Sequence, residues 1–463
     1  MHDWRKAVRT PLSYSVPGSS STLLRQQTNF VTAVVLTGTF VLLTLYILAP
    51  DATTARSSSS SSAALAEEHG HHHESTRSAG GGTGCECINA AESRSQPPYN
   101  STYPLTPVEV LPDGRLRYHI AAVADLDTRS RAANRADQWH SFLLRGLLTY
   151  DPATGSVDIS WSEGGEERLA SPYAAGGRGM ELSELVVFNG KLLTCDDRTG
   201  IVYEVVRRQT AESASSSATS SSSSSSNSAP AKWDLLPWVI LRNGDGRHSS
   251  SSSSKGGFKC EWMTVKGGHL YVGSLGKEWT TASGDRVLNA DPQWVKRVSV
   301  EGAVEHLDWR PAYAALVRAA GITSPPGYLI HEAAVYSERS RRWHFLPRRA
   351  SHDAYNEVAD EQRATNIVLS AEGEDLGRVN LTLAGVGRLS PTHGFSSVKL
   401  LPLKTDGNGG ETSQPEIALA LKSEESGDTV ASYVTVFRLD DGRVLLPETR
   451  ISAVHKYEGV EFV

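Results

Sequence analysis

The chain has 463 residues, a formal net charge of −6 and 39% hydrophobic residues. This length accommodates one large β domain or two ordinary domains. The mild negative charge gives no electrostatic reason to bind nucleic acid, and no basic stripe stands out along the chain. We therefore expect no nucleic-acid partner.

The apolar run at residues 30–49 is uncharged and 20 residues long. At about 1.5 Å per helical residue it can span a bilayer core of about 30 Å. Four basic residues precede it and Asp51 follows it, so the positive-inside rule predicts a cytoplasmic N-terminus. A cleaved signal peptide is the alternative. Glycosylation acceptors at Asn100 and Asn380 agree with a lumenal or extracellular position for the rest of the chain.

Residues 50–104 have the composition of a disordered stem. Serines, glycines and a histidine cluster (His69 and His71–His73) leave too little apolar surface for a core. The histidines could bind a metal, but solvated side chains in a linker are the simpler interpretation. Serine tracts at residues 214–228 and 249–254 exceed ordinary loop lengths. We interpret them as disordered insertions in a domain that spans residues 105–463.

The chain contains four cysteines, too few for a disulfide scaffold. Cys85 and Cys87 lie only two residues apart, a spacing poorly suited to a bond with each other. A link to another chain and idle thiols both stay open for this pair. Cys195 and Cys260 each fall in a predicted strand beside a candidate site segment. We expect buried free thiols there, with a disulfide as the alternative.

From Tyr118 onward, short runs rich in valine, isoleucine, tyrosine and tryptophan predict β-strands. Turn signals such as Asn189-Gly190 and Asp441-Gly442 separate them. The predicted strands are residues 119–123, 142–150, 157–161, 185–188, 201–206, 269–272, 297–300, 333–336, 343–346, 379–383, 398–403, 417–421 and 433–439. Only residues 311–320 form a convincing helix pattern. Many short strands with almost no helix predict a sandwich, a barrel or a propeller.

The C-terminal segment, residues 460–463, alternates apolar and polar side chains as a half-buried strand does. A propeller must join its first and last strands, because open sheet edges promote aggregation. We therefore predict that this terminus is ordered and paired inside the last blade.

Several short motifs occur in order between residues 178 and 462. Arg-Gly-Met-Glu-Leu-Ser-Glu-Leu stands at residues 178–185, Phe-Asn-Gly-Lys-Leu at 188–192 and Asp-Asp-Arg-Thr-Gly at 196–200. Lys-Cys-Glu-Trp, Ile-His-Glu, His-Gly-Phe-Ser-Ser and Lys-Tyr-Glu-Gly-Val-Glu-Phe follow, at 259–262, 330–332, 393–397 and 456–462. Together they resemble the calcium-activated nucleotidase (apyrase) family, from about Tyr118 to Val463.

The resemblance implies an all-β, five-bladed propeller around a central Ca²⁺ ion. The matched positions implied to hold this ion are Ser183, Glu261, Glu332, Ser396 and Glu458. They stand 62 to 78 residues apart, close to the length of a four-stranded blade with its loops, so each blade would contribute one oxygen ligand. Exposed glutamates are the alternative. Glu261 fits that alternative poorly, because its neighbours suggest a buried strand and buried carboxylates need a partner.

Four aspartates follow strand-like runs, at positions where a pocket would open: Asp125, Asp127, Asp196 and Asp197. Hydrolysis of a phosphoanhydride requires a positioned water, a base and neutralised phosphoryl charge. We predict that Asp125, Asp127 and Asp197 are catalytic and that Asp196 contacts the substrate. A structural turn is the alternative for Asp196 and Asp197.

Basic side chains in the same motif segments suit phosphate oxygens, because guanidinium groups donate in a fork. The predicted substrate-binding residues of this kind are Arg178, Arg198, Lys277, Arg348 and Arg349, with Glu278 beside them. Ion pairs on the surface or between blades are the alternative for each cation.

The resemblance implies calcium-dependent hydrolysis of nucleoside di- and triphosphates, such as UDP, GDP, ADP and ATP, to monophosphates. With the apolar run, it predicts a single-pass type II protein of the Golgi or ER membrane; a secreted form is also compatible. The oligomeric state, including a homodimer, stays open. The alternative from a different class is a catalytically silent propeller that binds a glycan or a protein, because propellers host both kinds of function.

Overall fold

The computed structural model describes residues 98–463, except positions 134 and 136 and the segments 163–164, 209–232, 248–256, 374–375 and 404–414. The apolar run at residues 30–49, most of the predicted stem and both serine tracts lie outside the described residues. No helix in the described part of the chain is long and apolar enough to cross a membrane.

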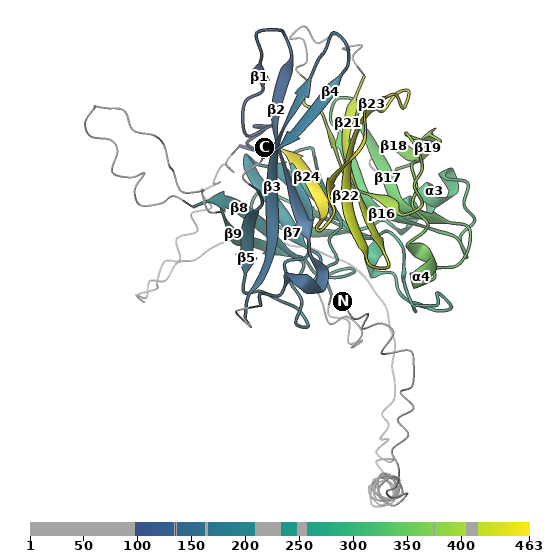
Figure 1. The fold of residues 1–463 in the computed structure, drawn as a ribbon. Coiled ribbons are helices and arrows are strands. Elements are labelled where there is room, and N and C mark those ends of the chain that lie inside the picture. The colour runs from purple at the N-terminus through teal and green to yellow at the C-terminus, as the bar shows by residue number, and fades with distance from the viewer. Residues whose placement is uncertain are drawn as a thin grey trace, which may run out of the picture. The chain divides into compact units, whose positions relative to one another are not determined.

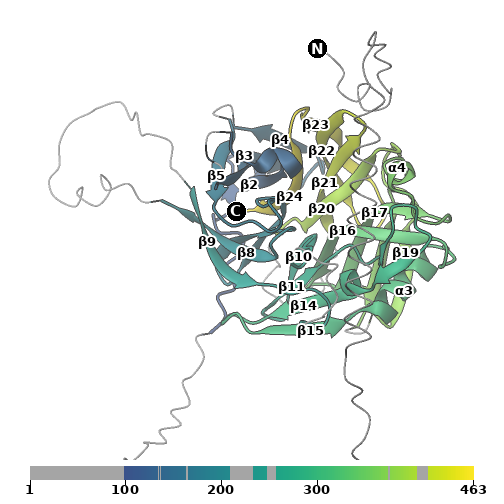
Figure 2. The same cartoon turned by 90° about the horizontal axis from the view of Figure 1, so that it is seen from below.

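Five β-sheets stand around a common centre and form a five-bladed propeller, as predicted (Figures 1 and 2). Blade 1 contains β1 (Glu109–Val110), β2 (Leu116–Asp125), β3 (Trp139–Tyr150), β4 (Val157–Trp161), β5 (Glu167–Ser171) and β24 (Lys456–Phe462). Blade 2 contains β6 (Leu182–Phe188), β7 (Lys191–Asp196), β8 (Ile201–Arg207) and β9 (Trp233–Ile240). Blade 3 contains β10 (Trp262–Lys266), β11 (His269–Gly273), β14 (Trp294–Val298) and β15 (Val304–Asp308). Blade 4 contains β16 (Tyr328–Ser337), β17 (Arg342–Ser351), β18 (Val368–Glu372) and β19 (Arg378–Leu383), and blade 5 contains β20 (His393–Leu400), β21 (Ile417–Ser426), β22 (Thr429–Arg438) and β23 (Val444–Ser452).

Short elements lie in the connections between these strands. They are the hairpin of β12 (Trp279–Thr280) and β13 (Val287–Asn289), the 3₁₀ turns η1 (Asp127–Ser130) and η3 (Asp291–Gln293), and the helices α3 (Arg310–Ala319) and α4 (Glu357–Asp360). The helix predicted at residues 311–320 is confirmed as α3, which begins with Pro311 in its first turn, where proline is well tolerated.

The C-terminal strand β24 closes the ring, but in a different sheet from the one predicted. It pairs with β2 of blade 1, for example through Ile120 opposite Phe462, rather than with a strand of blade 5. The first blade therefore takes its innermost strand from the end of the chain. The prediction of an ordered, paired terminus is confirmed, and its placement inside the last blade is wrong.

The apolar core is divided into five clusters of buried residues, one between each pair of neighbouring blades. Between blades 3 and 4, for example, the rings of Trp262 and Trp343 pack edge to face with their centres 6.2 Å apart. Strands with alternating side chains bury one row on each side in this arrangement. The centre is left to the innermost strands β6, β10, β16, β20 and β24.

These five strands run in the same direction along a central channel. Val187 near the end of β6 bonds to Glu461 near the end of β24, and Tyr336 of β16 bonds to Thr264 of β10. We call the end at which the strands begin the proximal mouth and the end at which they finish the distal mouth.

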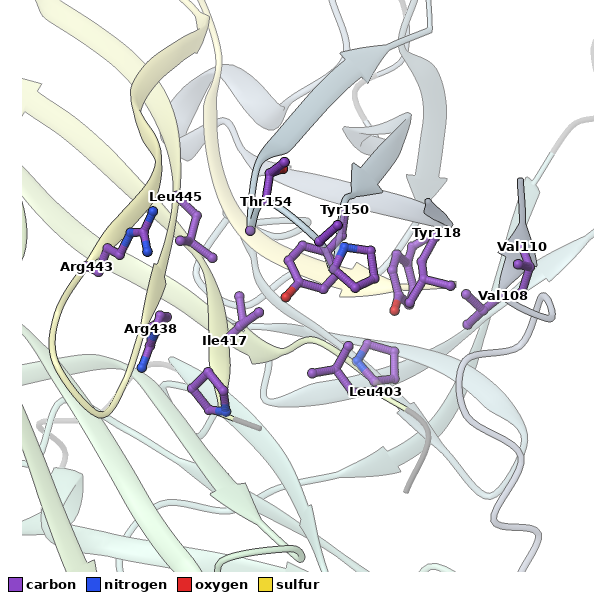
Figure 3. A pocket seen from close by; sticks show the side chains of 16 residues that line it. Val108, Val110, Tyr118, Tyr150, Thr154, Leu403, Ile417, Arg438, Arg443 and Leu445 are labelled. Atoms are coloured by element: carbon purple, nitrogen blue, oxygen red, sulfur yellow. The ribbon is translucent and has the colours of Figure 1, made fainter. Parts of the chain in front are cut away.

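A separate groove of about 450 Å³ lies between blades 1 and 5 (Figure 3). Its walls are largely apolar and include Leu116, Tyr118, Ile417 and Leu445. None of the site residues predicted from the sequence lines this groove.

Candidate functional site

Each predicted metal position lies on, or directly before, the innermost strand of a different blade. Ser183 is on β6, Glu261 precedes β10, Glu332 is on β16, Ser396 is on β20 and Glu458 is on β24. A β-bulge interrupts the strand pairing at four of these positions: Ser183, Glu332, Ser396 and Glu458. Glu261 is the exception, because it precedes its strand. A bulge leaves one residue unpaired and re-aims its side chain. The same local device therefore recurs in four blades at the proximal end of the channel.

Ser183 and Ser396 show whether a cation fits this ring. Both hydroxyls are buried, and neither has a hydrogen-bond partner among the described residues. An unpaired buried hydroxyl costs roughly 1–3 kcal/mol. A hard divalent cation prefers such oxygens together with carboxylates, and would relieve that cost. The donor set of the ring therefore fits a hard divalent cation.

The three glutamates of the ring contact Arg348, Lys259 and Lys456. Arg348 contacts Glu332, its Nη1 lies 2.8 Å from Glu458 Oε1, and Lys259 Nζ lies 2.6 Å from Glu261 Oε1. Burial raises the pKa of Glu261 and of Glu332, although Lys259 and Arg348 oppose the effect. For Glu458, neighbouring cations outweigh burial and lower the pKa. Carboxylates this close to one another need positive charge between them.

Lys456 brings two predicted catalytic residues to the same ring. Its Nζ lies 2.9 Å from Asp125 Oδ2, 2.9 Å from Asp127 Oδ2 and 3.6 Å from Glu458 Oε1. Asp125 ends β2, and its Oδ1 accepts a hydrogen bond of 2.7 Å from the backbone N–H of Asp127. Burial raises the pKa of Asp125 despite the lysine, whereas Lys456 outweighs burial and lowers the pKa of Asp127.

Arg178 and Arg198 join this network through Glu181. Arg178 Nε lies 2.7 Å from Glu181 Oε1, and Arg178 Nη2 lies 3.3 Å from Asp127 Oδ1. Arg198 Nε lies 3.6 Å from Glu181 Oε2. One oxygen each of Asp125, Asp127 and Glu181 lies within 4.8 Å of the others, close enough to share an ion. Because cations of the protein already pair with these carboxylates, the group mainly holds basic side chains in place.

Asp196 holds the turn that follows β7. Its Oδ1 accepts from the backbone N–H of Arg198, and its Oδ2 accepts from Met180 N and Thr199 Oγ1, each at 2.9 Å. Burial, and then the charge of Asp197, raises the pKa of Asp196 to about 6. Both oxygens thus serve the turn, so the geometry matches the structural alternative. Substrate contact by Asp196 stays a prediction.

Asp197 has different surroundings from its neighbour in sequence. Its Oδ2 forms an ion pair with Lys259, which also contacts Glu261 of the ring. Its Oδ1 is buried and has no hydrogen-bond partner among the described residues. A buried carboxylate oxygen that is free to accept a proton or orient a water is what a general base requires.

Lys277, Glu278 and Arg349 form a second group beside α4. Lys277 Nζ donates to the carbonyl oxygen of Glu278 at 2.7 Å and lies 4.2 Å from the centre of the Tyr355 ring. Arg349 Nε lies 3.8 Å from Asp360 Oδ2. Burial lowers the pKa of Lys277 and brings that of Arg349 to about 10. No described ion pair joins Lys277 or Glu278 to the network around Lys456.

Four residues of the network are not among the predicted site residues: Glu181, Lys259, Glu425 and Lys456. A usable signal exists for two of them. Lys259 and Lys456 each stand two residues before a glutamate of the ring, and this shared spacing is the signal. No comparable spacing identifies Glu425, whose Oε2 lies 3.3 Å from Lys456 Nζ.

Cys195 and Cys260 form a disulfide, so the expectation of free thiols is wrong. Their Cα atoms lie 6.3 Å apart, although 65 residues separate them in sequence. The bond joins β7 to the residue that precedes Glu261. Separation along the chain hides this proximity, which arises only when blades 2 and 3 pack together.

The sequence model described as Apyrase matches residues 126–463. The chain belongs to the apyrase family. The chain is 46% identical over 365 residues to "Soluble calcium-activated nucleotidase 1" of Rattus norvegicus, an alignment that covers 79% of this chain and 78% of the relative. It is 39% identical over 365 residues to "Apyrase" of Cimex lectularius, covering 79% and 87% of the two chains, and 38% identical over 360 residues to "Apyrase apy-1" of Caenorhabditis elegans, covering 77% and 87%.

Proposed function

We propose that this apyrase is a calcium-dependent phosphohydrolase that cleaves nucleoside di- and triphosphates, including UDP and GDP, to monophosphates and phosphate. One observation carries the proposal: the bulged oxygens of the channel adjoin a dense set of buried aspartates, arginines and lysines at one mouth. Family membership supports nucleotide phosphohydrolysis, and a rat relative carries calcium activation in its name.

Ca²⁺ would be held by Ser183, Glu261, Glu332, Ser396 and Glu458, and when bound it supplies positive charge to phosphate oxygens. The unpartnered hydroxyls of the two serines support this assignment. Arg348 and Lys259 contact the carboxylates of the ring and position them.

Phosphate charge would be taken up by cations that retain exposure at the proximal mouth. The side chains of Arg178 and Arg198 are 32% and 35% exposed, and both pair with Glu181. A guanidinium that forms an ion pair with one carboxylate can still donate to a phosphate oxygen, because it carries five N–H donors. Lys277, Arg348 and Arg349 are predicted to extend this surface.

Asp197 would activate the attacking water. Asp125 and Asp127 would position Lys456 beside that water. The free Oδ1 of Asp197 supports the role of base, because it can accept a proton without breaking a hydrogen bond in the described structure. Lys259 keeps Oδ2 of the same carboxylate in place.

The Glu332→Gln variant of the full chain tests the metal assignment. Phosphate release from UDP and GDP should lose its calcium dependence, and thermal stabilisation by calcium should disappear with it. Binding to the native state alone adds about 2.7 kcal/mol at a hundredfold excess of ligand over the dissociation constant. Unchanged calcium activation of this variant would remove the ring from the mechanism. An inactive wild-type chain that still binds calcium would favour the silent propeller.

We also propose that the enzyme acts in the secretory pathway as a type II membrane protein of the Golgi or ER. The charge pattern around residues 30–49 supports it. Asn380 lies exposed on β19, the outermost strand of blade 4, where a glycan could be accommodated. Digestion of the membrane-bound protein with an endoglycosidase tests both points, since only lumenal acceptors are modified.

A further inference from the structure

A second layer of buried charges lies below the metal ring, toward the distal mouth. It consists of Glu184, Lys399 and Glu461, which we call the distal ion layer. Lys399 Nζ lies 3.3 Å from Glu184 Oε2, and its charge also acts on Glu461. All three side chains are buried. Buried charges require partners of opposite sign, and Lys399 is that partner for the two carboxylates.

The distal ion layer ties four of the five innermost strands together. Glu184 on β6 accepts a hydrogen bond of 2.8 Å from Ser397 Oγ on β20, and the same hydroxyl accepts from Val460 N on β24 at 3.3 Å. Lys399 Nζ donates to the carbonyl oxygen of Met263 on β10 at 3.2 Å. Removing Lys399 would leave the buried carboxylate of Glu184 without its ion-pair partner.

These contacts lie immediately beside the proposed metal ligands along the chain. Glu184 follows Ser183, and Ser397 follows Ser396. Gly459, next to Glu458, permits close approach of β24 to β6, because a Cβ there would lie 2.6 Å from the backbone of Glu184. The spacing of the ligand-bearing strands is therefore set by contacts of the layer below them.

A short N-terminal segment covers the distal mouth. Residues 99–103, which we call the N-terminal strap, border a cavity of about 490 Å³ lined by the ends of all five innermost strands. Tyr103 is 41% exposed, yet its hydroxyl reaches inward and donates to Glu461 Oε1 at 2.9 Å. Asn100 N donates to Asn189 Oδ1 at 2.8 Å, and the Tyr99 ring lies 5.7 Å from that of Phe188.

We propose that the distal ion layer and the N-terminal strap form a lock that holds the metal-bearing strands at the spacing the cation requires, with Tyr103 as a positioning residue. The proposal rests on the calcium-dependent function proposed above. Tyr103 acts through Glu461 and Lys399 on β6, β10, β20 and β24, and it touches neither substrate nor the ring. Loss of the lock therefore weakens calcium binding without changing the chemistry at saturating calcium.

Calorimetric titration of the full chain with CaCl₂ tests this coupling in the variants Tyr103→Phe and Tyr103→Ala. We expect the dissociation constant for calcium to rise about threefold in the first variant and about tenfold in the second, where tenfold corresponds to about 1.4 kcal/mol. Turnover at saturating calcium, and the melting temperature without calcium, should stay close to those of the wild type. Tyr150→Phe is the matched control, because this tyrosine lies at the same end of the molecule but lines the groove between blades 1 and 5 (Figure 3).

The outcomes separate the lock from the function on which it rests. A wild-type chain that binds no calcium refutes the proposed function and the lock with it. Normal calcium binding in both Tyr103 variants refutes the lock alone. A lower melting temperature without calcium, combined with an unchanged dissociation constant, would also refute it, because the strap would then serve only stability. Equal shifts in the Tyr150→Phe control would do the same.

Discussion

The two mouths of the channel are built from the same five strands and differ in how their charges are satisfied. At the proximal mouth, bulges turn oxygens toward the axis, and two serine hydroxyls remain without partners in the described structure. At the distal mouth, Lys399 lies between two carboxylates and the N-terminal strap lies across the opening. The serine hydroxyls at the proximal mouth keep unused capacity as ligands, whereas a lysine of the protein neutralises the carboxylates at the distal mouth. The oxygens that are available to a ligand therefore lie where β-bulges interrupt the strand pairing.

The largest effect should follow from deleting residues 457–463. This deletion removes nearly all of β24, and with it Glu458 at one mouth and Glu461 at the other. The exposed edge of β2 would then be free to pair with other chains. We expect insoluble or wholly inactive protein, assessed by the soluble fraction and phosphate release. A soluble, active product would mean that neither mouth needs the closing strand.

The disulfide should matter at the proximal mouth, because it fixes the residue before Glu261. Replacing both Cys195 and Cys260 by alanine opens a loop with a sequence separation of 65 residues. A bond closing such a loop contributes about 4 kcal/mol in the chain-entropy treatment. We expect a loss of this order in chemical denaturation, with weaker calcium binding. Replacing Cys85 and Cys87 is the control and should leave both quantities unchanged.

The Asp196→Asn variant tests how strongly burial near the proximal mouth disfavours the ionised form of the Asp196 carboxyl. The pKa of Asp196 rises from 3.8 to about 6 on folding, so its stabilising contribution is present below pH 4 and is lost as the pH rises through 6. An amide does not titrate in this range. Between about pH 3 and pH 7 the wild type should lose about 3 kcal/mol of unfolding free energy relative to the variant. Denaturant unfolding of both proteins without calcium measures this, and a pH-independent difference would contradict the argument.

The smallest of these effects concerns chemistry alone. Asp197→Asn preserves the shape of the side chain and removes its ability to accept a proton. We expect turnover to fall roughly 10²-fold, or about 2.7 kcal/mol in barrier height, at unchanged calcium affinity. Steady-state kinetics at saturating calcium provide the measurement. Turnover near that of the wild type would leave Asp197 as a turn residue like its neighbour.

Local signals in the sequence predict an all-β fold, and the resemblance to the family narrows that prediction to a five-bladed propeller. Alternating β-branched runs and glycine turns predict most of the strands, and Pro311 marks the one long helix described. The motifs around Glu332 and Glu458 likewise predict carboxylates that face the central channel. These inferences depend on neighbours in the chain, which a sequence displays directly.

Features that depend on contacts between blades could not be found in this way. The Cys195–Cys260 bond joins residues far apart in sequence, and β24 pairs with a strand from the opposite end of the chain. The bulges at Ser183 and Ser396 depend on register against a partner strand, which no single segment encodes. The distal ion layer combines three blades, so its members look like ordinary strand residues when each is read alone.

The position of the N-terminal strap also defines at which end of the axis the described domain begins. Tyr99 packs beside Phe188, at the end of β6 where the innermost strands finish. The described domain therefore begins at the distal end of the axis. Asp125 and Lys456 lie at the opposite end, so the strap leaves the approach of a ligand from solution to these side chains unobstructed.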